Sequence, residues 1–269
     1  MKSRVASDIL GDAMIFSIIL FVVVIFALSI FYSTIIRIQK YTFYSSFNTD
    51  LHFVLISDYH SNPFISLPSL NRKIKRINPE MIVLLGDITD RHDKDLTKTR
   101  IFLEKLEELH IPTYYVLGNH ERYRQDCQKI QGLYKKYGIS HIGEEVTLEE
   151  QKKGLSIYGF DYDGILRCKE KEGKLHILFT HSYENFRKYS HENVDFIFSG
   201  HTHGGQIRLP FLGQILGHGP TFFPKYSKGV YKISKDQILC ITSGLGNSSF
   251  PLRLFNFVEI ADIKIRNRH

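Results

Sequence analysis

Cysteine is scarce in this chain of 269 residues: there are three, Cys127, Cys168 and Cys240, and none has Cys-x-x-Cys spacing. An odd number of scattered thiols provides neither a disulfide framework nor a cysteine-based zinc site. Internal repeats and long linkers rich in proline, serine or glycine are absent as well. With 8 prolines, 19 glycines and 43% hydrophobic residues, the composition excludes collagen-like, low-complexity and wholly disordered proteins.

The positive charge of the chain is diffuse. Lysine and arginine total 35 against 28 acidic residues, which gives a net charge of +7. No basic strip interleaved with aromatic residues is present, so we expect no nucleic-acid partner. A moderately basic surface suits an anionic substrate or an anionic membrane surface instead. The sequence points to no particular protein partner.

One long hydrophobic run stands near the amino terminus. Residues 13–36 contain no charged side chain, and as a helix they would extend for roughly 36 Å, enough to cross a bilayer. A cleaved signal peptide is the alternative, but its apolar core should be shorter and a small-x-small cleavage site should follow it. We therefore predict a single-pass transmembrane anchor that places the protein in the cell membrane.

The flanks of this run divide the rest of the chain. Residues 1–12 form an amino-terminal flank, and residues 37–50 read as a juxtamembrane linker whose Tyr41, Phe43 and Tyr44 resemble interfacial anchors. Lysine and arginine are nearly balanced on the two sides, so the side of the membrane that carries the domain stays open. Residues 51–269 are expected to form one domain.

The domain alternates short apolar runs with amphipathic segments. Six runs rich in β-branched and aromatic residues predict buried strands, at 51–57, 81–86, 113–118, 175–180, 194–200 and 237–244. Between the early runs, helical spacing predicts helices over 68–78, 95–110 and 121–137. Strands that alternate with helices indicate an α/β layered domain. The run KISKD at 232–236 predicts a hairpin turn.

Five of the predicted strands end in side chains that commonly bind metals. In chain order these are Asp58, His60, Asp87, Asn119, His181, His201 and His203. Because the carboxyl ends of strands in an open α/β sheet lie along one edge, we expect these side chains to meet there. Seven candidates are too many for one ion and suit two. Mixed imidazole and carboxylate ligands favour manganese, iron or zinc over magnesium or calcium.

The order of these motifs resembles the calcineurin-like metallophosphoesterases. The string D-x-H, G-D-x-x-D, G-N-H-E, H and G-H-x-H occurs in sequence between about Leu51 and Phe257. The segments GHTHGGQIRLP (200–210), FPKYSKG (223–229) and SGLGNSSFPLRL (243–254) resemble the bacterial membrane-associated phosphodiesterase branch of that family. The resemblance implies a four-layer αββα sandwich, here preceded by one transmembrane helix.

The resemblance also implies a role for each motif residue. Asp58, His60 and His203 would bind a first divalent ion, and Asn119, His181 and His201 a second. Asp87 would bridge the two ions, for which Mn²⁺ is the expected metal and Zn²⁺ or iron the alternatives. The catalytic residues would be His120, which protonates the leaving oxygen, Asp90, which pairs with it, and Arg91, which holds a phosphate oxygen.

The expected activity is hydrolysis of a phosphodiester or pyrophosphate bond by a metal-bridging hydroxide, in a membrane-anchored enzyme whose substrate includes a lipid-linked phosphoester. The alternatives are a phosphomonoesterase or protein phosphatase, or a nucleotide phosphodiesterase, at the same site. A non-enzymatic scaffold is disfavoured because every ligand position is filled.

Two apolar loops follow the last of these motifs. Phe222-Phe223 and Phe250–Phe255 are expected to belong to the core, with contact to a lipid or the bilayer as the alternative hypothesis.

Overall fold

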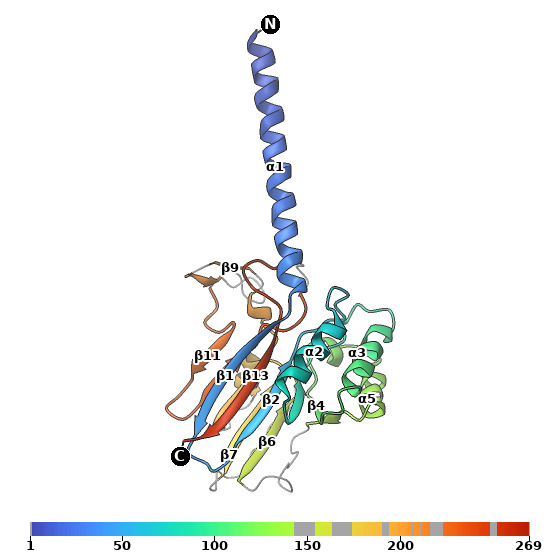
Figure 1. Cartoon of the computed structure of the whole chain (residues 1–269), viewed down its shortest axis with the longest axis vertical. Coiled ribbons are helices and arrows are strands. Elements are labelled where there is room, and N and C mark those ends of the chain that lie inside the picture. The colour runs from blue at the N-terminus through green and yellow to red at the C-terminus, as the bar shows by residue number, and fades with distance from the viewer. Residues whose placement is uncertain are drawn as a thin grey trace.

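The computed structural model describes residues 2–142, 154–162, 174–189, 194–205, 207–209, 211–215, 223–247 and 252–268. Two mixed sheets form the centre of the domain, and one long helix projects from it (Figure 1). The six-stranded sheet contains, in spatial order, β1 (Arg37–Ser45), β13 (Glu259–Asn267), β2 (Leu51–Ile56), β3 (Met81–Leu84), β4 (Thr113–Tyr115) and β5 (Ser140–His141). The five-stranded sheet contains β11 (Gly229–Lys232), β12 (Ile238–Ile241), β8 (Phe196–Ser199), β7 (Leu175–Thr180) and β6 (Leu155–Phe160).

Helices cover the outer faces of both sheets. The helices on the six-stranded sheet are α2 (Leu67–Ile77), α3 (Thr97–Glu107) and α5 (Cys127–Lys136), and α6 (Tyr183–Tyr189) packs on the other sheet. Strand β2 shows how the layers are separated: Val54 and Ile56 face the helices, whereas Phe53 and Leu55 face the second sheet. Burial on both faces explains why the inner strands read as continuous apolar runs.

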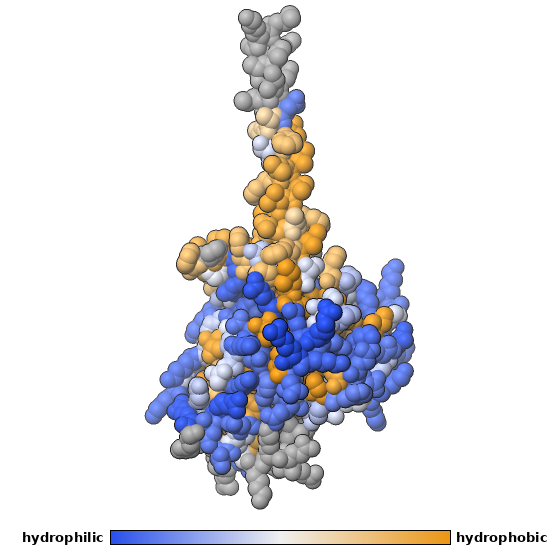
Figure 2. Space-filling model, in the orientation of Figure 1, coloured by the Kyte–Doolittle hydropathy of each residue, from blue (hydrophilic) through white to orange (hydrophobic). Residues whose placement is uncertain are grey.

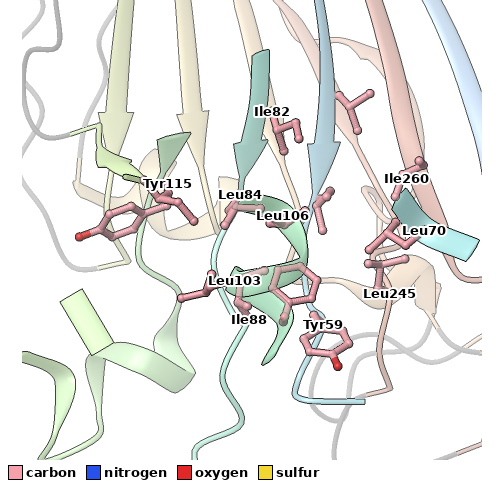
Figure 3. Packing of buried hydrophobic residues seen from close by; sticks show 14 of the residues in the cluster. Tyr59, Leu70, Ile82, Leu84, Ile88, Leu103, Leu106, Tyr115, Leu245 and Ile260 are labelled. Atoms are coloured by element: carbon pink, nitrogen blue, oxygen red, sulfur yellow. The ribbon is translucent and has the colours of Figure 1, made fainter. Parts of the chain in front are cut away.

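Three hydrophobic clusters fill the three interfaces between these layers. In the cluster beneath the helices, Leu103 and Leu106 of α3 lie near Leu84 of β3 (Figure 3). Between the sheets, the rings of Phe53 and Phe198 pack edge to face, with their centroids 5.1 Å apart. The predicted four-layer αββα fold is thereby confirmed.

The helix boundaries follow local capping. Helix α2 begins after Ser66, whose hydroxyl accepts a hydrogen bond from the Ser69 N–H, and ends at Asn78 with a left-handed φ of 53°. The segment 121–137, expected as one helix, instead divides into α4 (Asn119–Arg122) and α5. Between them, Arg124 donates to the backbone carbonyl oxygens of Asp90 and Asp93, which ties the break to the loop after β3.

The hairpin predicted at 232–236 is confirmed, since β11 and β12 pair antiparallel around it with Lys232 opposite Ile238. The expected linker over 37–50 is not a linker for most of its length. Residues Arg37–Ser45 form β1, which pairs in parallel with β13 at the edge of the six-stranded sheet. Phe43 is buried between the sheets rather than placed at a membrane interface, because β1 runs away from the preceding helix (Figure 1).

Helix α1 (Lys2–Thr34) contains a stretch, Gly11–Thr34, that is long and apolar enough to cross a membrane. Most of this stretch is exposed, but its carboxyl end is docked onto the loop before β13. The Tyr32 and Phe257 ring centroids are 4.6 Å apart, and the Arg253 N–H donates to the Ser29 hydroxyl at 3.0 Å. The helix therefore leaves the domain from a fixed point.

Candidate metal centre

The seven predicted ligands follow the carboxyl ends of β2, β3, β4, β7 and β8, and the fold brings them together. All of them are buried except His201, which is partly exposed. The ligand atoms of six of them, with those of His120, form three groups in which the atoms of each group lie within 4.8 Å of one another: Asp58, His60 and His203; His60, Asp87 and His120; and Asp87, His181 and His201. The seventh, Asn119, lies beside the third group, with its amide oxygen 3.1 Å from Nε2 of His181. Asp87 therefore lies between two sets of ligand atoms.

The backbone of the cluster is strained. Five of the seven residues have positive φ angles, between 47° and 70°: Asp58, His60, Asp87, His201 and His203. Residues other than glycine rarely adopt this conformation, which costs about 1–3 kcal/mol at each position. Such strain is concentrated at functional sites, where the surrounding structure enforces it.

Two glycines allow neighbouring loops to approach closely enough to form the cluster. A Cβ atom on Gly118 would lie 2.1 Å from Oδ1 of Asp87, and one on Gly200 would lie 2.7 Å from Oδ2 of Asp58. Both distances are shorter than van der Waals contact. Only glycine, which has no Cβ atom, leaves room for the carboxylates of Asp87 and Asp58 at these two positions.

Backbone carbonyl groups orient two of the histidines. The Nδ1 atom of His181 lies 2.7 Å from the Leu85 carbonyl oxygen, and Nδ1 of His203 lies 3.1 Å from that of Gly246. Since a carbonyl oxygen only accepts, we assign the proton to Nδ1 in both rings. This leaves Nε2 of each ring directed at the cluster, as in metal-binding histidines whose other nitrogen donates to a carbonyl group.

The remaining contacts fit cations better than they fit hydrogen bonding alone. Among the residues that the structure describes, neither ring nitrogen of buried His60 has a hydrogen-bond partner; carboxylate oxygens of Asp90 and Asp87 lie 3.4 and 3.6 Å away. Nδ1 of His201 and Nε2 of His181 face each other at 3.1 Å. Converging imidazole nitrogens and carboxylates form a suitable ligand set for divalent transition metals.

The charges of the cluster are tightly coupled. Burial alone would raise the pKa of Asp87, but its contact with His181, 3.2 Å away, holds the pKa well below the usual range. Burial lowers the pKa of His181, whereas the charge of Asp87 raises it, to about 9 in total. A metal ion that binds Nε2 of His181 would have to displace the second proton of this ring, the one to which the raised pKa refers.

The three predicted catalytic residues are placed differently from one another. Nδ1 of His120 accepts a hydrogen bond from the Arg91 backbone N–H at 3.2 Å and lies 3.6 Å from Asp90. Burial would raise the pKa of Asp90, but the adjacent His120 and His60 lower it overall. The Arg91 side chain is exposed, and its Nε donates to His92 rather than reaching into the cluster.

Glu121 is a buried residue to which the sequence reasoning gave no role. Its carboxylate accepts hydrogen bonds from the backbone N–H groups of Asp87, Gly118 and Thr89, at 2.8, 3.1 and 2.9 Å. Burial and the nearby charge of Asp87 raise the pKa of Glu121. The residue fixes the loops after β3 and β4 to each other. Its only sequence signal is its position at the end of the Gly-Asn-His-Glu motif.

Comparison with known proteins gives a consistent result. Residues 51–205 match the family described as calcineurin-like phosphoesterase. An uncharacterized metallophosphoesterase of Campylobacter jejuni is 28% identical over 241 residues, which cover 81% of this chain and 60% of that protein. A zebrafish (Danio rerio) protein named as a transmembrane protein with a metallophosphoesterase domain is 25% identical, over 80% of this chain and 53% of its own length.

An uncharacterized metallophosphoesterase of Bacillus subtilis, YkuE, is 28% identical over 80% of this chain and 78% of its own length. The chain thus spans less than two thirds of the Campylobacter and zebrafish relatives and most of the Bacillus one. The family match covers more than half of the chain and contains all seven clustered residues. The chain belongs to the calcineurin-like phosphoesterase family.

Proposed function

We propose that this protein is a membrane-anchored, binuclear-metal phosphoesterase that hydrolyses a phosphodiester or pyrophosphate bond in a lipid-linked substrate. The observation that carries the proposal is the pair of ligand groups on either side of Asp87. Asp58, His60 and His203, whose ligand atoms lie within 4.8 Å of one another, would hold one ion. His181 and His201, with the Asn119 amide oxygen 3.1 Å from His181 Nε2, would hold the other.

Manganese is the proposed metal, because its ligand preferences include both the carboxylate oxygens and the imidazole nitrogens of this site. When bound, two such ions would neutralise phosphate charge and activate water for in-line attack. The chain itself supplies the orientation of the ligands. Leu85 and Gly246 fix two imidazole rings through their carbonyl oxygens, and the Ser57 hydroxyl donates to Asp58 at 2.6 Å.

His120 is proposed as the general acid. The ring would act in its imidazolium form, because a neutral imidazole would have to become an anion in order to give up its Nε2 proton. That proton is the one available to the departing oxygen when the phosphoester bond breaks. Asp90, at the edge of the cluster, would stabilise the ring as its charge changes during catalysis.

A diester or pyrophosphate is favoured over a monoester by the place of Arg91. Arg91 was expected to hold a phosphate oxygen, a contact that would suit a doubly charged monoester best, but its side chain donates to His92 instead. A lipid-linked substrate is favoured by the helix α1, which is docked at the same edge of the domain as the cluster. Leu245 donates to the Ser57 carbonyl oxygen beside Asp58, and Val258 donates to that of Tyr32 in α1.

Hydrolysis of model substrates by the full chain in detergent tests the activity. With Mn²⁺ we expect cleavage of bis-p-nitrophenyl phosphate in preference to p-nitrophenyl phosphate, and no cleavage with a chelator. Asp87→Asn should lower the rate by about 100-fold or more, because it weakens both metal sites. Asp236→Asn, at an exposed hairpin position, is the matched control and should retain full activity.

His120→Ala separates acid catalysis from metal binding. Its activity on an alkyl phosphodiester should fall by about 100-fold or more, since an alkoxide needs a proton to leave. Its activity on p-nitrophenyl esters should fall much less, because p-nitrophenolate leaves without one. Equal losses on both substrates would contradict the proposed role. Preference of the unmodified chain for the monoester would favour a phosphomonoesterase instead.

A further inference from the structure

Three phenylalanines combine high exposure with a strained backbone. The side chain of Phe211 is fully exposed, and those of Phe223 and Phe255 are 61% and 50% exposed. All three have left-handed φ angles, 69°, 51° and 52°, a conformation that is unusual for a bulky residue. Leu212, next to Phe211, is 66% exposed. Exposing a large apolar side chain to water is unfavourable, and the strained turn adds a further cost. This combination indicates that a lipid or protein surface contacts these side chains.

These residues lie on loops that contact one another. Phe211 and Leu212 connect β9 (Arg208–Leu209) to β10 (Gly213–Gln214), and the Phe223 N–H donates to the Ile215 carbonyl oxygen at 3.0 Å, just after β10. The β9 end of this hairpin is joined to the loop that bears Phe255, because the Arg208 N–H donates to the Leu254 carbonyl oxygen.

The same loops contact the end of α1. The Phe255 ring lies 5.7 Å from the ring of Tyr32, and Phe257 packs on both Phe31 and Tyr32. Figure 1 places β9 at the level where α1 meets the domain, and Figure 2 shows orange, hydrophobic side chains there beside the base of the helix. The apolar surface of the helix thus continues sideways onto the domain.

We propose that Phe211, Leu212, Phe223 and Phe255, here called the apolar collar, insert into the interfacial layer of the same bilayer that α1 crosses. The proposal rests on the membrane anchor of the proposed function and adds a second, lateral contact to it. We assign a lipid surface rather than a protein as the partner of the collar, because the collar continues the face of a helix that is itself apolar and exposed. Aromatic side chains favour that interfacial layer.

The collar is also connected to the candidate metal centre. Arg208 of the hairpin donates through its guanidinium to the Gly204 carbonyl oxygen at 2.9 Å, directly after His203. Asn256, next to Phe255, donates to the His203 carbonyl oxygen at 2.8 Å. Insertion of the collar would therefore hold the ligand-bearing edge of the domain against the bilayer, where a substrate can reach it without leaving the lipid phase.

The chain contains no tryptophan, so a single introduced tryptophan reports its own surroundings. To test the proposal, Phe211→Trp and Leu212→Trp are made as two separate variants of the full chain. Each variant is reconstituted into nanodiscs of phosphatidylethanolamine and phosphatidylglycerol. Some of the nanodiscs also contain lipids brominated in their acyl chains. Tyr44→Trp is the matched control, because Tyr44 is 58% exposed near the far end of β1.

We expect blue-shifted emission and strong quenching by the brominated lipids at positions 211 and 212, and water-like, unquenched emission at position 44. Water-like emission at 211 and 212 in nanodisc-bound protein would overturn the proposal. A blue shift without quenching would also overturn it, since it would mean that another protein surface covers the collar. The readout does not require activity, so failure of the proposed hydrolysis would leave this result intact.

Discussion

At Asp87 one carboxylate group joins several parts of the fold. Its Oδ1 accepts the His120 N–H at 2.8 Å, and its Oδ2 lies 3.2 Å from His181 and 3.6 Å from His60. The loops after β2, β3, β4 and β7 therefore meet at this residue. A change that displaces this carboxylate would therefore affect both groups of predicted ligands at once.

Gly118→Ala should displace that carboxylate. The new methyl group would overlap Oδ1 of Asp87, and overpacking of this kind lowers the free energy of unfolding by about 1–3 kcal/mol. Gly132→Ala, in helix α5, is the control and should raise stability by up to about 1 kcal/mol, because among the described residues nothing beyond its own stretch of helix lies within 4 Å of the new Cβ. Thermal unfolding of both variants checks this, and equal melting temperatures would contradict it.

Glu121→Gln should weaken the hydrogen bonds that hold the loops after β3 and β4 together. Glutamine has one acceptor oxygen, so at least one of three buried N–H groups would lose its partner, at a cost of about 1–3 kcal/mol in the free energy of unfolding. Denaturant titration measures the loss. Glu107→Gln, at an exposed position of α3, should leave the midpoint unchanged. A Glu121→Gln variant as stable as the control would show that the carboxylate is dispensable.

At the scale of elements, the sequence predicts best what depends on neighbouring residues. The six predicted strands and the β11–β12 hairpin follow from local composition and spacing, whereas the buried strands β6 and β13 were not predicted. Strand β1 was missed because its nine residues mix charged, polar and aromatic side chains, and only the edge of β13 makes them a strand. The buried Arg253 was missed for the same reason: its carbonyl partners come from Ser243, Gly246 and Phe257, gathered by the fold.

The place of β1 leads to a truncation prediction. A chain of residues 37–269 retains the pairing of β1 with β13, whereas residues 46–269 would expose the β13 edge and the cavity left by Phe43. Unpaired strand edges promote aggregation. In size-exclusion chromatography we expect the longer form to elute as a discrete species and the shorter form to aggregate. Identical elution of the two would mean that β1 is not needed for the sheet.

At the scale of the whole molecule, the order of the strands determines where the site lies. Strand β1 leaves the end of α1 and runs parallel to β13, while β2 runs antiparallel to β13, so β2 returns to the edge from which α1 departs. The sequence predicted the hydrophobic helix from its uncharged run. It did not predict that the helix is docked through Tyr32 and Ser29, because those contacts involve residues more than 200 positions away.

The metal content of the purified full chain shows whether the cluster around Asp87 holds two ions. After equilibration with Mn²⁺ and removal of free metal, inductively coupled plasma mass spectrometry should find about two manganese ions per chain. The same number is expected for Asp236→Asn, and about one or fewer for Asp87→Asn, which removes charge between both ligand groups. A chain without bound metal, or an Asp87→Asn variant with the full complement, would contradict the account.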